Sequence, residues 1–446
     1  MGRCVLGSMV IALAIGGSLC FGQDEATPTA QEVAPADGGD HAAAVAPGHG
    51  HAGPKMGELL PLWSMLPFAG LLLCIAVFPL ANPHWWEHNR NKGIIAAVLA
   101  VPTAFYLASF GALGLHALEH AGREYLAFVL LLGSLFVISG GVYVRGRLAG
   151  TPVVNTTFLA IGTAVASFVG TTGASMLLIR PLLRANETRV RVAHIVVFFI
   201  FTVSNCGGLL TPLGDPPLFL GFLKGVPFEW TFRLTPQWLV VNGILLTVFF
   251  IWDTLVYRSE KATGDTEPPL TTDAPQETFG LEGAQNLLFL GAIVAIIYSA
   301  GNGIGTGGKE WPPFLQEGLM LVTGVASYLM TSSKVREKNR FGFGPIIEVA
   351  ILFAGIFVTM IPALAILNVN GKELGLTEEW HFFWAAGILS SFLDNAPTYL
   401  TFAATAAGIR GIPLEGKYLA EFLTLDGAAE RLAAVSCGAV FMGANT

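Results

Sequence analysis

The feature that most constrains this chain is a series of apolar windows of about 20 residues, each long enough to cross the ~30 Å hydrocarbon core of a bilayer as a helix. Of the 446 residues, 53% are hydrophobic and only 12% are charged. Soluble proteins carry roughly 25% charged residues, so this chain has too little polar surface for water. We therefore predict an all-α polytopic membrane protein with about 9–11 membrane segments.

The N-terminus has the pattern of a secretory signal. Arg3 precedes an apolar run, and the segment that follows is rich in Ala, Pro, Gly and Asp. A basic residue before a short apolar run is typical of a cleaved signal peptide, although a first membrane span is the alternative. We predict a signal peptide over 1–22 and a disordered extracytoplasmic tail over 23–58. The mature N-terminus would then lie outside the cytoplasmic (inner) membrane, ahead of N-terminal transmembrane helices in 59–120.

Two of the apolar segments are too long for one crossing and have a polar or glycine-containing middle. These segments, 153–184 and 380–408, fit re-entrant hairpins, because broken backbone at membrane depth is tolerated only where protein or a wet cavity covers it. Treating 153–184 as a hairpin also places the loops richer in Lys and Arg on the cytoplasmic side. The predicted spans are 62–81, 93–115, 124–143, 153–184, 191–222, 237–256, 284–300, 312–331, 345–368, 380–408 and 428–446.

An inverted repeat follows from the two hairpins. The stretch ASFVGTTGAS at 166–175 aligns with SSFLDNAPTY at 390–399, and each hairpin is followed by a segment that holds Ser and then Cys-Gly. The charge pattern gives the two units opposite orientations, an arrangement found in many secondary transporters. We predict a first repeat over 121–222 with a broken helix over 191–222, connecting helices over 223–340, and a second repeat over 341–446.

The second repeat stops where its counterpart continues into PLGDPP. We expect the sequence to lack a last partial helix, and a genuine short terminus is the alternative.

Polar and helix-breaking residues gather at the two predicted hairpin tips and in the predicted broken helices. In inverted-repeat transporters such positions meet near the midplane, where half-helix N-termini attract anions and unwound carbonyls coordinate cations. The predicted substrate- or ion-binding residues are Thr171, Thr172, Ser204, Asn205, Gly207, Gly208, Thr211, Gly214, Asp215, Asp394, Asn395, Asn445 and Thr446.

Three carboxylates fall within or near these apolar segments. A charge at the bilayer centre costs at least ~2.5–3.5 kcal/mol, so such residues are functional candidates. Asp215 could instead cap a helix near the membrane surface, and Asp394 could be an ordinary N-cap. Glu348 is a candidate proton or ion relay, with an interfacial position as the alternative.

A protease motif also occurs in the chain. His116, Glu119 and His120 match H-x-x-E-H, the spacing of a zinc site with a Glu base. The motif lies at the end of a predicted span and no hydrophilic catalytic domain accompanies it, so chance is the simpler explanation.

The motifs SNCGGLLTPLGDPP, GTTGAS and SSFLDNAP resemble the ion transporter superfamily, which includes NhaD-type sodium/proton antiporters, citrate and dicarboxylate carriers and arsenite pumps. The resemblance covers roughly 60–446 and is closest to the citrate transporter and sodium:proton antiporter proteins of that group. It implies a homodimer with scaffold and transport domains, the latter moving as an elevator. The carboxylate carriers have Ser-Asn-Thr tips, whereas this chain has GTTG at 170–173 and LDNAP at 393–397, and an Asp-Asn tip is similar to those of sodium/proton antiporters.

We therefore expect a secondary transporter, not an enzyme, that exchanges sodium for protons. Asp394 and Asp215 would bind a cation or a proton in turn, and neutral oxygens would complete the coordination of a hard cation. Cation-coupled uptake of citrate or another di- or tricarboxylate is the alternative, and an intramembrane metalloprotease is a third. The expected partners are sodium ions, protons and the lipid bilayer, with no resident cofactor or metal and no nucleic acid.

Overall fold

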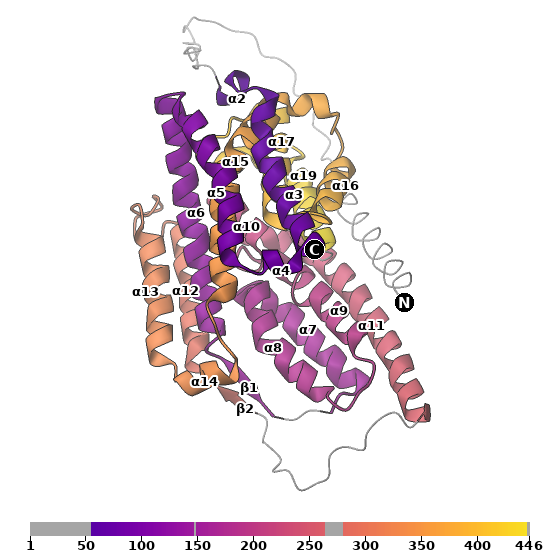
Figure 1. Ribbon diagram of the computed structural model, residues 1–446. Helices are drawn as coiled ribbons and strands as arrows, with labels where there is room; N and C mark the ends of the chain where they lie inside the picture. The colour runs from indigo at the N-terminus through magenta and orange to yellow at the C-terminus, as the bar shows by residue number, and fades with distance from the viewer. Residues whose placement is uncertain (1–54, 147–148, 264–279, 444–446) are drawn as a thin grey trace, which may run out of the picture.

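The computed structural model describes residues 55–146, 149–263 and 280–443, and these residues are almost entirely helical (Figure 1). Within the described ranges, seven helical segments are long and apolar enough to cross a membrane. They are Leu62–Ala81, Asn89–Ala108, Ala112–Ser139, Pro152–Val169, Ala193–Leu210, Phe228–Thr263 and Gly344–Leu374. The chain is an all-α polytopic membrane protein, as predicted. The predicted signal peptide and most of the predicted tail lie outside the described residues.

The described chain begins with a group of helices in which the boundary between the second and third predicted spans differs from the prediction. Sequence patterns predicted spans at 93–115 and 124–143, whereas the chain turns at 109–111 and one helix of 28 residues follows. Gly111, at φ 65°, supplies the backbone conformation of this turn. The elements are α2 (Met56–Leu59), η1 (Leu62–Met65), α3 (Leu66–Ala81), α4 (Pro83–Trp86), α5 (Asn89–Ala108) and α6 (Ala112–Ser139).

The first predicted hairpin consists of two packed helices, α7 (Pro152–Val169) and α8 (Thr171–Ala185). Gly170 joins the two helices, and its φ of 82° is a backbone conformation that residues with a side chain rarely adopt. The next segment is broken as predicted into α9 (Ala193–Thr202), η2 (Cys206–Leu210) and α10 (Pro216–Leu223).

Within the described residues, the connecting region contributes three long helices and one strand of a small antiparallel ribbon. In the ribbon, β1 (Tyr143–Arg145) pairs with β2 (Gly280–Glu282), with Tyr143 opposite Glu282. The helical elements are η3 (Phe228–Leu234), α11 (Thr235–Thr263), α12 (Gln285–Gly301), α13 (Leu315–Met330) and α14 (Ser333–Lys338).

The second unit repeats the order of helix, helix pair and helix. Helices α7 and α8 lie in one half of the molecule, and α16 and α17 lie in the other half (Figure 1). The helical elements are α15 (Gly344–Asn370), η4 (Gly371–Leu374), α16 (Glu379–Ser390), α17 (Asn395–Ile409), α18 (Tyr418–Phe422) and α19 (Ala428–Gly443).

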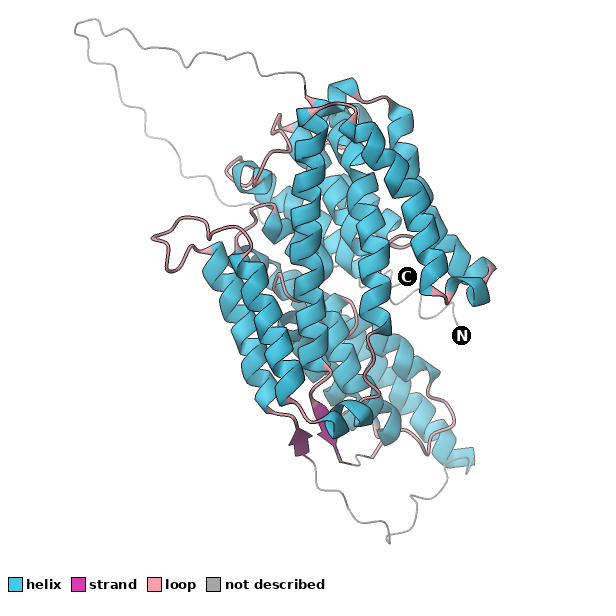
Figure 2. Cartoon of the chain, turned by 60° about the vertical axis from the view of Figure 1, so that its left-hand side comes forward, coloured by secondary structure: helices cyan, strands magenta, loops and turns pink. Residues whose placement is uncertain are grey.

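The leading helices of the two units pack against each other through aromatic side chains. Phe128 of α6 stacks on Phe353 of α15, with ring centroids 4.6 Å apart, and also contacts Phe357. Phe128 and Phe357 are fully buried, so this contact lies in the hydrophobic core. Figure 2 shows how helices make up almost all of the described chain, with the two short strands at one end. Aromatic pairs add about 0.5–1.5 kcal/mol beyond the burial of their area, which favours a fixed packing of α6 on α15.

A buried polar cluster holds the base of the first hairpin on α11. Asn155 near the start of α7 and Asn186 at the end of α8 exchange amide hydrogen bonds of 3.0 and 2.8 Å. Asn155 also donates to Asp253 at 2.9 Å. Arg189 forms ion pairs of 2.6 Å with Asp253 and 3.0 Å with Glu260. Since buried charges are stable only when paired and hydrogen-bonded, this cluster fixes both ends of the hairpin.

Candidate functional site

The candidate site is built around a stretch of broken backbone between α9 and α10. Pro216 and Pro217 begin α10, because proline lacks the N–H that the first helical turn leaves unpaired. Asp215 occupies the N-cap position with extended backbone, but its side chain makes no cap hydrogen bond. The alternative in which Asp215 serves as a helix cap therefore finds no support in the geometry.

The first hairpin tip closes over one side of this broken stretch. The Thr171 backbone N–H donates to the Gly214 carbonyl at 2.8 Å, and the Thr171 hydroxyl donates to Asp215 Oδ1 at 3.3 Å. Gly208 and Gly214 pack backbone against backbone, since a Cβ on Gly214 would collide with the Gly208 carbonyl. The two glycines thus allow the tip and the unwound segment to approach closely.

Ser167 joins the same hairpin to the 3-10 turn of the broken segment. Its hydroxyl donates to the Gly207 carbonyl at 2.5 Å, and Thr211 donates to the Ser167 carbonyl. Trp238 of α11 donates to the same Gly207 carbonyl at 3.2 Å. Sequence reasoning did not select Ser167 or Trp238. The Ser-Phe pair common to both hairpins was the available signal for Ser167.

The second hairpin tip reaches the broken stretch from the other unit. Asn395 Nδ2 donates to Asn205 Oδ1 at 2.9 Å and to Asp215 Oδ2 at 3.3 Å. Ser390, which sequence reasoning also missed, donates to Asn395 Oδ1 at 3.0 Å and to the Ala439 carbonyl at 2.6 Å. Asn205 Nδ2 donates in turn to the Val440 carbonyl of α19 at 2.5 Å. Residues from both units therefore converge on Asp215.

Asp394 has the capping role that sequence reasoning left open. Its Oδ1 accepts the Ala396 N–H at 2.9 Å and so caps α17. The residue is half-buried and lies near enough to Asp215 for their charges to interact. The cap leaves Asp394 Oδ2 without a hydrogen bond among the described residues, so this oxygen is available for a ligand.

Burial and charge set what this site can bind. The exposed fraction is 4% for Asp215, 6% for Asn205 and 5% for Thr171. Within the described part of the chain, every ion pair lies elsewhere, so no basic side chain neutralises Asp215 or Asp394. Around Asp215 lie a hydroxyl and amides. A buried carboxylate among neutral oxygen donors suits a proton or a hard cation.

Three helix N-termini also meet at this point. Helix α8 begins at Thr171 and helix α17 begins at Asn395, and the side chains of both residues donate hydrogen bonds to Asp215. Helix α10 begins at Pro216, directly after Asp215. Each N-terminus carries roughly half a positive charge, which favours anions, including the carboxylate of Asp215 itself.

Some predicted site residues lie apart from this junction. Thr172 is exposed and makes no side-chain hydrogen bond within the described residues. Ser204 accepts a hydrogen bond of 2.7 Å from Ser175, beside the junction. Glu348 pairs with the buried Lys92 of α5 at 2.6 Å, a contact between α15 and α5 and not part of the junction. Asn445 and Thr446 lie outside the described residues.

The protease-like motif lies inside helix α6. The prediction had placed the motif at the end of the span 93–115. Glu119 pairs with Arg123, and His120 lies 3.5 Å from Glu124, so both form contacts along the helix. In the described ranges no group of three or more His, Cys, Asp or Glu side chains is placed to hold a metal ion. No observation therefore favours the metalloprotease alternative.

The comparison with protein families supplies one match. Residues 57–446 match the family described as "Putative citrate transport", which covers most of the chain. No curated protein matches the chain.

Proposed function

The chain belongs to the family for putative citrate transport, and from this membership and the site geometry we propose that it exchanges sodium ions for protons across the cytoplasmic (inner) membrane. The family identifies a secondary transporter, and the seven apolar helical segments among the described residues identify a multi-pass membrane protein. We propose the specificity for sodium and protons, the location in the cytoplasmic (inner) membrane and the extracytoplasmic position of the mature N-terminus.

The observation that carries the proposal is the buried, unneutralised carboxylate of Asp215. A charge without a partner in a protein interior costs several kcal/mol, and binding either a proton or Na⁺ removes that cost. Thr171 and Asn205 would supply neutral oxygens to a bound cation. Because one carboxylate cannot hold both ligands together, inward and outward fluxes of sodium and protons would be coupled.

The hydrogen bonds of the junction support movement as one body. Ser167 and Thr171 tie the first hairpin to the broken segment, while Ser390 and Asn395 tie in the second hairpin and α19. Independent opening of one tip would break these buried bonds, at about 1–3 kcal/mol each. An elevator movement of the whole unit against a scaffold, in a homodimer, would preserve them.

Cation-coupled transport of citrate or a similar carboxylate is the second candidate. The family description and the three helix N-termini at the junction favour it. Against it stands the absence of a basic side chain paired with the site in the described residues, since Arg and Lys are the usual partners of substrate carboxylates.

Proton flux in everted vesicles separates the two candidates. A pH-sensitive dye reports the collapse of an imposed proton gradient after addition of sodium, lithium or citrate. We expect sodium to dissipate the gradient, Asp215→Asn to abolish the response and Glu310→Gln, which changes an exposed carboxylate, to retain it. Uptake of labelled citrate without any sodium-dependent proton movement would reject antiport in favour of the second candidate.

A further inference from the structure

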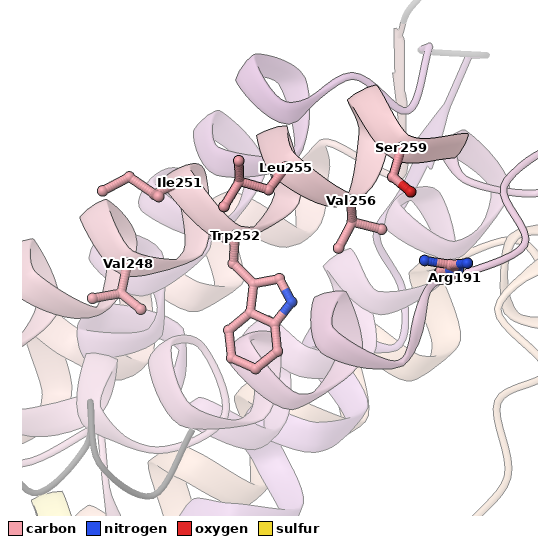
Figure 3. A pocket seen from close by; sticks show the side chains of 7 residues that line it. All are labelled: Arg191, Val248, Ile251, Trp252, Leu255, Val256 and Ser259. Carbon is pink, nitrogen blue, oxygen red and sulfur yellow. The ribbon is translucent and has the colours of Figure 1, made fainter. Parts of the chain in front are cut away.

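A groove on the outer surface of α11 lies away from the candidate transport site. It holds about 540 Å³ and has one polar end, formed by Arg191 and Ser259. An apolar stripe of Val248, Ile251, Trp252 and Leu255 forms the remainder (Figure 3). The Trp252 ring and the Val256 side chain project from the same side of α11 and also line the groove, and Arg191 lies at its Ser259 end (Figure 3).

The length of the groove fits one leaflet of a bilayer. From Val248 to Ser259 the helix rises by about 16 Å at ~1.5 Å per residue. Half of the hydrocarbon core is about 15 Å thick. Val248 lies near the middle of the 29-residue helix α11, so Ser259 and Arg191 lie at the level of the lipid headgroups when Val248 lies near the midplane.

The polar end carries an excess of positive charge. Arg191 is exposed, and its guanidinium forms no ion pair within the described residues. Its backbone N–H donates to Glu260 Oε1 at 2.7 Å, which fixes the position of the residue. The Glu260 carboxylate is itself buried and paired with Arg189. Arg258 and Lys261 add exposed cations on the same end of α11.

We propose that this groove binds an anionic glycerophospholipid of the cytoplasmic leaflet. Its phosphate would contact Arg191 and Ser259, and one acyl chain would lie along the stripe from Leu255 to Val248. The charge pattern of the loops places this end of α11 on the cytoplasmic side, where basic sites between membrane helices bind anionic headgroups. The inference does not depend on which substrate the protein transports.

The bound lipid would touch the base of the first hairpin. Trp252 stacks on His194, with ring centroids 6.3 Å apart and planes 7° from parallel. His194 contacts Asp253 at 2.8 Å, and Asp253 holds both Asn155 and Arg189. The back wall of the groove is thus part of the cluster that fixes the hairpin on α11.

Native mass spectrometry of the full chain in detergent tests the proposal. The protein is titrated with dioleoylphosphatidylglycerol or with dioleoylphosphatidylcholine, for the wild type and three variants. We expect the anionic lipid to bind preferentially, and Arg191→Gln to weaken it about fivefold, the effect of about 1 kcal/mol per cation. Val256→Trp, which fills the groove without changing charge, should also weaken it. Lys334→Gln removes an exposed cation elsewhere and should have no effect.

Five results would overturn the proposal. Four of them are equal binding of both lipids, equal losses for Arg191→Gln and Lys334→Gln, displacement of the lipid by inorganic phosphate, and a dimer that Val256→Trp converts to a monomer. The loss of a dimer would assign the groove to a second copy of the chain. Retention of the lipid by a correctly folded Val256→Trp variant, judged by size-exclusion chromatography, would equally contradict the assignment.

Discussion

Removal of Asp253 should destabilise the protein more than removal of any surface carboxylate. Asp253 is fully buried in α11. It forms an ion pair with Arg189 at 2.6 Å and hydrogen bonds with His194 at 2.8 Å and with Asn155 at 2.9 Å. Asp253→Ala leaves the buried Arg189 with one carboxylate partner, Glu260, and leaves the Asn155 amide without its acceptor on α11.

The expected loss follows from these partners. Breaking a buried ion pair costs about 3–5 kcal/mol, because the remaining charge stays buried without compensation. Arg189 keeps Glu260 at 3.0 Å, so we expect the lower end of that range, about 3 kcal/mol. Asp253→Asn keeps the volume and one acceptor oxygen and should lose less.

Equilibrium unfolding in mixed micelles, followed by tryptophan fluorescence, measures the loss, and Trp252 reports directly on the region. The matched control is Glu282→Ala, which breaks the exposed pair with Lys338 and should cost no more than about 1 kcal/mol. If Asp253→Ala costs no more than Glu282→Ala, the cluster does not hold the hairpin as we argue.

Three further predictions concern the junction. Gly214→Ala should destabilise the protein by about 1–3 kcal/mol through overlap with the Gly208 backbone, whereas Gly243→Ala, with no neighbour within 4 Å, should be neutral or stabilising in the same unfolding assay. Asn395→Ala should raise the sodium concentration for half-maximal proton efflux about fivefold or more, since buried polar partners lose their hydrogen bonds, whereas Asn302→Ala in an exposed loop should not. Lowering the pH should raise that sodium concentration by up to about tenfold per unit, because protons compete for Asp215, and a pH-independent value in dye-monitored vesicles would contradict competition.

The helices were largely predictable because their signals are local. A window of apolar residues is the same whatever it packs against, so both hairpins and the broken segment 191–222 were expected at nearly the positions observed. The boundary between α5 and α6 was wrong because polar residues at 116–123 suggested a loop. In the structure Glu119 and Arg123 pair along one helix, and Gly111 makes the turn instead.

The site was only partly predictable because its contacts join residues far apart in the chain. Asp215, Asn205 and Asn395 were expected from the cost of burying polar groups beside helix breaks. Their partners Ser167 and Ser390 were not, since a serine in an apolar helix commonly bonds its own backbone. Glu348 could not be separated from the site until its contact with Lys92 was seen.

The cluster at the base of the first hairpin determines how α11 can take part in any movement. Asn155 and Asn186 hold the two ends of the hairpin together, and Asp253 and Glu260 hold that base to α11. A displacement of the hairpin tip therefore carries the half of α11 that holds Asp253 and Glu260 with it, unless buried ion pairs break. In an elevator movement α11 would belong to the moving body, and the scaffold would have to be built from helices outside the junction, such as α5, α12 and α13.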